Sequence, residues 1–215
     1  LYVDGITNVR DIGGWVTENG NRTNQGLLYR CARLNESKDN GSGVIITDAG
    51  KSVMLNELGV KTEIDVRRAE KGETGGLTAS PLGDTVKYLN FPMDHANDIL
   101  NDNKEQIMNF FETLADKENY PMIIHCSVGC DRTGMLVFMV NALLGVSEED
   151  LIRDYMFSNF ADVDNKRKVE TLKSTAYYQA ITSAKGDTLS EKAYNCLADF
   201  GVPAEHLDAV ISILS

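Results

Sequence analysis

The chain has few of the residues that mark disulfide-rich or zinc-binding proteins. Only four cysteines occur among its 215 residues, Cys31, Cys126, Cys130 and Cys196. They are too few and too scattered for a disulfide framework, and no pair has zinc-finger spacing with matching partners elsewhere. The sequence therefore predicts no metal site and no other cofactor.

Long apolar runs and excess positive charge are also absent. No apolar stretch is long enough to span a membrane, and the N-terminus lacks a basic segment followed by an apolar one. The net charge of −11 argues against general binding to nucleic acid or anionic membranes. Nothing resembles a linker, so we expect one domain over residues 1–215, soluble and more compatible with the cytoplasm than with secretion.

One stretch stands out against this background, His-Cys-Ser-Val-Gly-Cys-Asp-Arg-Thr-Gly at residues 125–134. Residues 121–124 before it read as a short buried strand, and the apolar run 135–144 after it reads as a core helix. A strand, a tight loop and a helix in this order build an anion site. The loop amides and the first helical N–H groups converge on one point, with the positive end of the helix behind them.

Cys126 and Arg132, at the two ends of this loop, indicate the chemistry. A thiol beside converging amides, a helix N-terminus and a guanidinium loses its proton easily, so Cys126 is expected to be a thiolate near neutral pH. A thiolate is a good nucleophile towards phosphorus. Arg132 offers a planar fork of donors that matches two oxygens of a phosphate.

The other residues of the stretch are expected to hold the bound phosphate. Ser127, Val128, Gly129 and Cys130 supply the loop backbone, and glycine lets it approach the ligand closely. We expect Thr133 to hydrogen-bond the sulfur of Cys126 and to help it leave. His125 is expected to orient the loop through backbone groups rather than to act as a base.

This stretch resembles the signature of the protein tyrosine phosphatase superfamily, His-Cys-x5-Arg-Thr/Ser. Asn-Val-Arg-Asp-Ile-Gly-Gly at residues 8–14 is similar to the Asn-Phe-Arg-Asp-Leu-Gly-Gly element of a bacterial-type tyrosine phosphatase family, and residues 29–32 and 64–67 resemble its strand motifs. The resemblance implies a dual-specificity or tyrosine phosphatase that uses a cysteine nucleophile. Its substrate would be a phosphorylated protein or small phosphoester, and its product inorganic phosphate.

The chain departs from that family's pattern at one position. Cys130 stands where the family usually has Lys, and this Lys is associated with action on phosphoinositides. Its loss, on an acidic chain, favours phosphotyrosine over an inositol lipid. Cys130 or Cys31 could also protect oxidised Cys126 as a disulfide partner, although the favoured interpretation is that both are simply small packing side chains.

The expected reaction needs a general acid, and two carboxyls qualify. Asp94 follows the predicted strand 86–91, and its distance from Cys126 along the chain resembles that of dual-specificity phosphatases. Asp131 lies inside the loop, and in the similar family this Asp is thought to share the acid role. An Asx turn or helix cap is the alternative interpretation of Asp94.

The remaining pattern predicts an α/β fold, with a parallel-rich central sheet flanked by helices and the phosphate-binding loop between a strand and a helix. Strands are expected at residues 27–32, 61–66, 86–91 and 121–124, and residues 70–85 are expected to form a loop. We expect Arg10, Arg30 and Arg67 to form structural ion pairs, with Asp11 and Asp65 as partners. Five aromatic residues are expected to pack in the core, with a rim or lid over the pocket as the alternative, namely Tyr155, Phe157, Phe160, Tyr177 and Tyr178.

Together these features predict two-step phosphomonoester hydrolysis through a thiophosphate on Cys126. Three alternatives remain at this point. The chain could act on phosphoinositides or inositol phosphates, or it could be a non-catalytic module that only binds phosphate. Arsenate reduction or sulfur transfer uses similar loops, but the Asp-Arg-Thr-Gly ending favours phosphatases.

Overall fold

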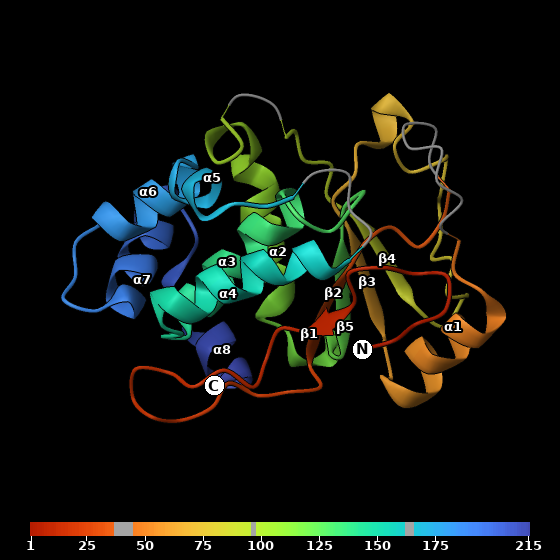
Figure 1. Cartoon of the computed structure of the whole chain (residues 1–215), viewed down its shortest axis with the longest axis horizontal. Helices are drawn as coiled ribbons and strands as arrows, with labels where there is room; N and C mark the ends of the chain where they lie inside the picture. Colours follow the sequence, from red (N-terminus) through yellow and green to blue (C-terminus); the bar gives the residue numbers. More distant parts are fainter. Residues whose placement is uncertain (37–44, 96–97, 162–165) are drawn as a thin grey trace.

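A five-stranded, mostly parallel sheet forms the centre of the molecule (Figure 1). The computed structural model describes residues 1–36, 45–95, 98–161 and 166–215. Its strands run in the order β1-β2-β5-β3-β4, and only β1 is antiparallel to its neighbour. Their bounds are β1 Arg10–Asp11, β2 Leu28–Cys31, β3 Thr62–Asp65, β4 Lys87–Asn90 and β5 Met122–His125. The predicted α/β class is confirmed.

Helices cover both faces of this sheet (Figure 1). The α-helices are α1 Asp48–Ser52, α2 Lys104–Leu114, α3 Arg132–Leu143, α4 Glu148–Phe157, α5 Val169–Lys173, α6 Ala176–Ser183, α7 Leu189–Phe200 and α8 Ala204–Leu214. A π-helical turn, η1 Val53–Glu57, extends α1. Short 3₁₀ turns are η2 Ala69–Lys71, η3 Asn101–Asn103, η4 Lys117–Asn119 and η5 Ser158–Phe160.

The alternation of side chains along the strands divides the core into two clusters. On β5, Met122 and Ile124 face the larger cluster, which α2, α3, α7 and α8 cover, whereas Ile123 faces the smaller cluster beside η1. Both faces of the sheet are therefore buried, as parallel sheets require. On β3 this burial includes Glu63 and Asp65, which are fully enclosed.

Helix α3 runs through the centre of the larger cluster, and every one of its residues is buried. It begins at Arg132, one turn earlier than the apolar run from residue 135 predicts, because the turn that closes the loop is itself helical. Among the described residues, no helix has the length and apolar character to cross a membrane.

The aromatic residues of the C-terminal half divide into two groups. Tyr155, Tyr177 and Tyr178 are buried, as predicted. The prediction of core packing is wrong for Phe157 and Phe160, which are 42% and 89% exposed. Phe157, the last residue of α4, stacks on Trp15 instead, with ring centroids 6.1 Å apart, and Phe160 follows in η5.

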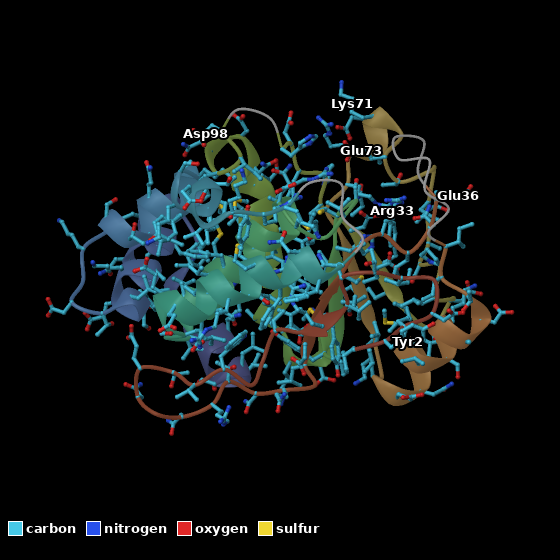
Figure 2. All side chains as sticks on the ribbon, viewed as in Figure 1. Tyr2, Arg33, Glu36, Lys71, Glu73 and Asp98 are labelled. Carbon is cyan, nitrogen blue, oxygen red and sulfur yellow. The ribbon has the colours of Figure 1, made fainter. Side chains whose placement is uncertain are left out.

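The carboxyl ends of the parallel strands share one edge of the sheet, and the segments that follow them gather there. Figure 2 shows Arg33, Glu73 and Asp98, which follow β2, β3 and β4 respectively, on the same side of the molecule, opposite Tyr2. The stretch that begins at Cys126 leaves β5 at this edge.

Candidate active site

The loop from Cys126 to Asp131 joins β5 directly to α3. Gly129 has a φ of +73°, and a Cβ added there would lie 2.2 Å from the carbonyl oxygen of Cys31 on the neighbouring chain segment. Only glycine fits this turn, both for its left-handed backbone and for the close approach. The loop is also tied to the end of β2, because the Arg33 N–H donates to the Ser127 carbonyl at 3.1 Å.

Cys126 lies buried at the start of the loop, 2% exposed. Burial alone would raise the pKa of its thiol, but the charge of Arg132 and hydrogen bonding from Thr133 outweigh burial and lower this pKa. The Thr133 hydroxyl is itself buried and makes no other hydrogen bond of ordinary geometry among the described residues. The site therefore favours a thiolate at Cys126.

Glu73 holds the guanidinium of Arg132 in place. Its carboxylate accepts from Nη1 of Arg132 at 2.6 Å, and the Met93 carbonyl accepts from the same nitrogen at 3.1 Å. Nη2 donates to the Ser127 hydroxyl at 3.3 Å, whereas Nε has no hydrogen-bond acceptor among the described residues. This arrangement leaves one edge of the fork available for an anion.

His125 is fully buried between the loop and two carboxylates. Its Nδ1 lies 3.2 Å from the Cys126 carbonyl oxygen, and its Nε2 lies 2.9 Å from Glu63. Burial disfavours the charged ring, but Asp65 and Glu63 raise the pKa of His125 above its ordinary value. Both contacts place an acceptor oxygen on a ring nitrogen, which suits a doubly protonated imidazolium. His125 thus supports the backbone of Cys126.

A second buried network supports the loop from its outer side. Asn8 donates through its side-chain amide to the carbonyls of Val128 and Gly129, at 3.1 and 3.2 Å, and Arg30 donates to the Gly129 carbonyl. Asp154 from α4 binds both Arg30, at 2.6 Å, and Arg10, at 2.8 Å. The carbonyls of Val128 and Gly129 therefore point into this network.

The arginines of the predicted strand ends form structural ion pairs. Arg67 and Asp65 are both fully buried and 2.7 Å apart. The expected pairing of Asp11 with an arginine is wrong. Among the described residues, its carboxylate accepts hydrogen bonds from the backbone N–H groups of Gly13 and Gly26 instead. The short Asp side chain bonds backbone N–H groups that lie close to it, which leaves it no acceptor capacity directed at an arginine side chain.

Each candidate acid is a chain neighbour of Arg132 or of a residue that hydrogen-bonds Arg132. Asp131 directly precedes it, is 53% exposed at its side chain and pairs with Arg167 at 3.1 Å. Asp94 directly follows Met93, whose carbonyl accepts from Arg132. Its side chain is 45% exposed and pairs with Arg68 at 3.2 Å, while its backbone is held by Asn103. Both carboxyls are thus positioned, and both reach solvent.

Cys130 contributes packing rather than charge at the family's Lys position. Its side chain is buried beside Asn8, whose amide lies 3.5 Å from the sulfur. Burial raises the pKa of the Cys130 thiol, which keeps it neutral. All four cysteines are free thiols in this structure.

One group of side chains has the composition of a metal site, namely Glu63, Asp65 and His125. Its oxygens are already engaged, because Arg67 and Tyr88 donate to Asp65 and Ser80 donates to Glu63. The cluster is therefore satisfied by protein donors.

Several residues of this site were not found from the sequence. Glu73 lies in the segment 70–85, which reads as a polar loop, and Glu63 lies in a strand whose alternation is typical of one solvent-facing side. Asn8 was noted only as part of a motif, although its φ of +59° marks a special backbone position. The only sequence signal for Glu73 is its position as an acidic residue among glycines. This pattern is too common in loops to identify a site residue.

Comparison with known proteins agrees with this geometry. The model of the tyrosine phosphatase family matches residues 1–214. A provisionally named tyrosine-protein phosphatase of Cupriavidus necator is 25% identical over 183 residues, which is 74% of this chain and 63% of that protein. A tyrosine-protein phosphatase of Nostoc commune is 27% identical over 132 residues, which is 53% of this chain and 45% of that protein. The chain thus spans less than two thirds of the length of these relatives.

Among solved structures, TpbA of P. aeruginosa in complex with pTyr is 17% identical, with a TM-score of 0.45 over 74% of this chain and 88% of that one. The family match carries the assignment, since it covers nearly every residue and includes both the loop of Cys126 and the network of Asn8 behind it. The chain belongs to the tyrosine phosphatase family.

Proposed function

We propose that this chain is a cysteine-dependent phosphomonoester hydrolase, with phosphotyrosine as its favoured substrate. The single observation that carries the proposal is the environment of Cys126. A buried thiol with a lowered pKa faces a guanidinium at the N-terminus of a buried helix, and the Nε of this guanidinium has no acceptor in the part of the chain that the structure describes. A phosphate bound there has a nucleophile on one side and donors to its oxygens on the others.

In the first step the Cys126 sulfur attacks phosphorus and forms a thiophosphate. Arg132 and the loop amides hold the three non-reacting oxygens, while Asp94 or Asp131 gives a proton to the leaving oxygen. Water then attacks phosphorus in the second step, and the same carboxylate takes its proton. Phosphate leaves, and the sulfur returns to the thiolate that Thr133 and Arg132 stabilise.

A phosphoinositide or inositol phosphate is the second candidate substrate, since the similar family includes such enzymes. The acidic body of the chain and the neutral thiol of Cys130 oppose a highly anionic ligand. A non-catalytic binding module is the third reading, and the lowered pKa of Cys126 speaks against it, because a binder gains nothing from a reactive thiolate.

The test is phosphate release from a panel of substrates by the wild-type protein and by Cys126→Ser under reducing conditions. The panel contains a phosphotyrosine peptide, a phosphoserine peptide, a phosphoinositide and an inositol polyphosphate. Release from the phosphotyrosine peptide that vanishes in the variant is the expected result. Preference for the inositol compounds would favour the second candidate, and no release from any compound would favour the binding module.

A further inference from the structure

Arg68, which lies in the segment after β3, binds two carboxylates of the site at once. Its Nε and Nη2 both donate to Oε1 of Glu73, at 2.8 and 2.6 Å, and its Nη1 donates to Oδ1 of Asp94 at 3.2 Å. The backbone N–H of Arg68 donates to Oε2 of Glu73 at 2.9 Å. Three contacts with Glu73 thus fix the guanidinium, and its Nη1 is thereby directed at Asp94.

These contacts join Arg132 to Asp94 through one chain of ion pairs. Oε2 of Glu73 accepts from Nη1 of Arg132 at 2.6 Å, while Oε1 accepts from Arg68. Glu73 lies at the edge of the sheet where the loop of Cys126 begins (Figure 2). The exposed fraction of the side chain is 4% at Glu73, 19% at Arg68 and 45% at Asp94. The chain of alternating charges is therefore anchored in the protein at Glu73 and reaches solvent at Asp94.

The backbone of Asp94 is held by other contacts. Asn103, which is buried, accepts from the Asp94 N–H at 2.6 Å and donates to the Asp94 carbonyl at 2.7 Å. The preceding carbonyl, that of Met93, accepts from Arg132 at 3.1 Å. With the backbone held on both sides, the carboxyl of Asp94 changes its direction by rotation of its own side chain, and the ion pair with Arg68 limits this rotation.

A carboxyl that transfers a proton must keep one oxygen directed at the atom that receives it. A protonated carboxyl can accept from Arg68 through its carbonyl oxygen while the hydroxyl on its other oxygen donates to the leaving group. The carboxylate that remains is stabilised by the charge of Arg68 until it takes a proton from water in the second step. One contact with Arg68 therefore suits Asp94 in both steps.

The other candidate acid is supported from a different direction. Asp131 pairs at 3.1 Å with Arg167, which lies in the segment before α5. The chain of ion pairs through Glu73 leads to Asp94 instead.

We propose that Arg68 is the positioning residue for proton transfer by Asp94. The inference rests on the proposed function and takes Asp94 as its acid. Because one carboxylate, Glu73, orients both arginines, the phosphate oxygens at Arg132 and the leaving oxygen near Asp94 are placed in a common frame. Arg68 acts through Asp94 and not on the reacting atoms themselves.

The test is a double-mutant cycle of Arg68→Met and Asp94→Asn. kcat/KM is measured with phenyl phosphate, a poor leaving group, and with para-nitrophenyl phosphate, whose phenolate leaves without a proton. The Ki of inorganic phosphate as a competitive inhibitor reports whether Arg132 still binds an anion. Arg68→Lys is a second variant, since lysine keeps a charge beside Glu73 but lacks the fork that reaches both carboxylates. Arg153→Met, which breaks exposed pairs on α4, is the control.

Arg68→Met is expected to lower kcat/KM about tenfold for phenyl phosphate and by less than about twofold for para-nitrophenyl phosphate, because only the first leaving group needs a proton. Arg68→Lys is expected to show the same discrimination with a smaller loss. The Ki of phosphate is expected to stay constant, since Glu73 still binds Arg132. In the Asp94→Asn protein, adding Arg68→Met is expected to change kcat/KM for phenyl phosphate by less than about twofold. Arg153→Met is expected to change none of these values.

Four results would overturn the positioning role of Arg68. They are a loss of equal size for the two aryl phosphates, a tenfold loss that survives in the Asp94→Asn protein, a raised Ki of phosphate that accounts for the loss, and full activity of both Arg68 variants. Absence of turnover by the wild type, or turnover that survives Cys126→Ser, would instead overturn the proposed function itself.

Discussion

At the scale of single residues, the position of a carboxyl relative to Arg132 decides which groups can take part in proton transfer. Asp131 directly precedes Arg132, and Asp94 directly follows Met93, whose carbonyl accepts a hydrogen bond from Arg132. Both carboxyl side chains are about half exposed. Glu73 is different, because it is buried and already holds two arginines, Arg68 and Arg132. We therefore assign Glu73 a positioning role and leave the acid role to the two exposed carboxyls.

Asp94→Asn and Asp131→Asn are expected to differ in how they respond to the leaving group. The variant that lacks the acid is expected to lose activity in proportion to the pKa of the leaving phenol, up to about 10²–10⁴-fold for the poorest leaving groups. A series of aryl phosphates with kcat measured for each variant provides the comparison. A loss of equal size across the whole series would reject that residue as the acid.

Glu73→Gln is expected to lower kcat/KM by about 10- to 100-fold, because it replaces a charge-assisted hydrogen bond to Arg132 with a neutral one. The pKa of the Glu73 carboxyl is held low despite its burial, through hydrogen bonds from Arg68 and Arg132, so the carboxylate form is present at neutral pH. Glu70→Gln, an exposed residue three positions earlier, is the matched control. Equal kcat/KM values for the two variants would contradict the positioning role.

At the scale of elements, the sequence was sufficient to predict the strand, loop and helix around Cys126 and most strands of the sheet. These features depend on local signals, namely apolar runs, glycines and a motif with fixed spacing. The partners of the loop were not predictable, because Asn8 and Asp154 lie more than 20 residues from it along the chain and reach it only through the packing of β1 and α4. The alternation of polar and apolar residues along β3 is also misleading. It indicates one solvent-exposed face, whereas both faces of the sheet are covered by elements distant in the sequence.

The contact between α4 and the strands depends on the buried carboxylate of Asp154. Burial would raise its pKa, but Arg30 and Arg10 lower that pKa below the ordinary value. Asp154→Asn leaves these two arginines buried without a countercharge and is expected to cost about 3 kcal/mol or more of unfolding free energy at pH 7. Glu149→Gln, which breaks an exposed pair with Arg153 on the same helix, is expected to cost at most about 1 kcal/mol.

The acid dependence of this contribution has a definite sign. Because the folded-state pKa of Asp154 is below its unfolded value of about 4, its stabilisation is complete above pH 4 and is lost as the pH falls through the folded-state pKa. Urea unfolding of the wild type and Asp154→Asn across this range measures it. A stability difference that stays constant down to the lowest pH would contradict the assigned ion pairs.

At the scale of the whole molecule, a positive site lies within a protein of net charge −11. Its arginines are balanced by nearby carboxylates, as in the Arg132–Glu73 pair, so the field that an approaching substrate meets is that of the acidic body. We expect this field to influence substrate choice more than any single residue outside the loop.

The expected consequence is a salt dependence that changes sign with the substrate. For a phosphotyrosine peptide with acidic flanking residues, KM is expected to fall as salt rises towards about 0.1 M, where charges more than about 10 Å apart are screened. For a peptide with basic flanking residues, KM is expected to rise. Steady-state kinetics of the two peptides provides the check, and identical salt profiles would contradict the long-range effect.

The central claim is that the Cys126 thiolate becomes phosphorylated during turnover. The most direct measurement is mass spectrometry of the protein after rapid acid quenching of a reaction with phenyl phosphate. The account predicts one added phosphoryl group on the peptide that contains Cys126, and none on that peptide in Cys126→Ser. Turnover by the wild type without any phosphoryl group on this peptide, or with the group on another residue, would contradict it.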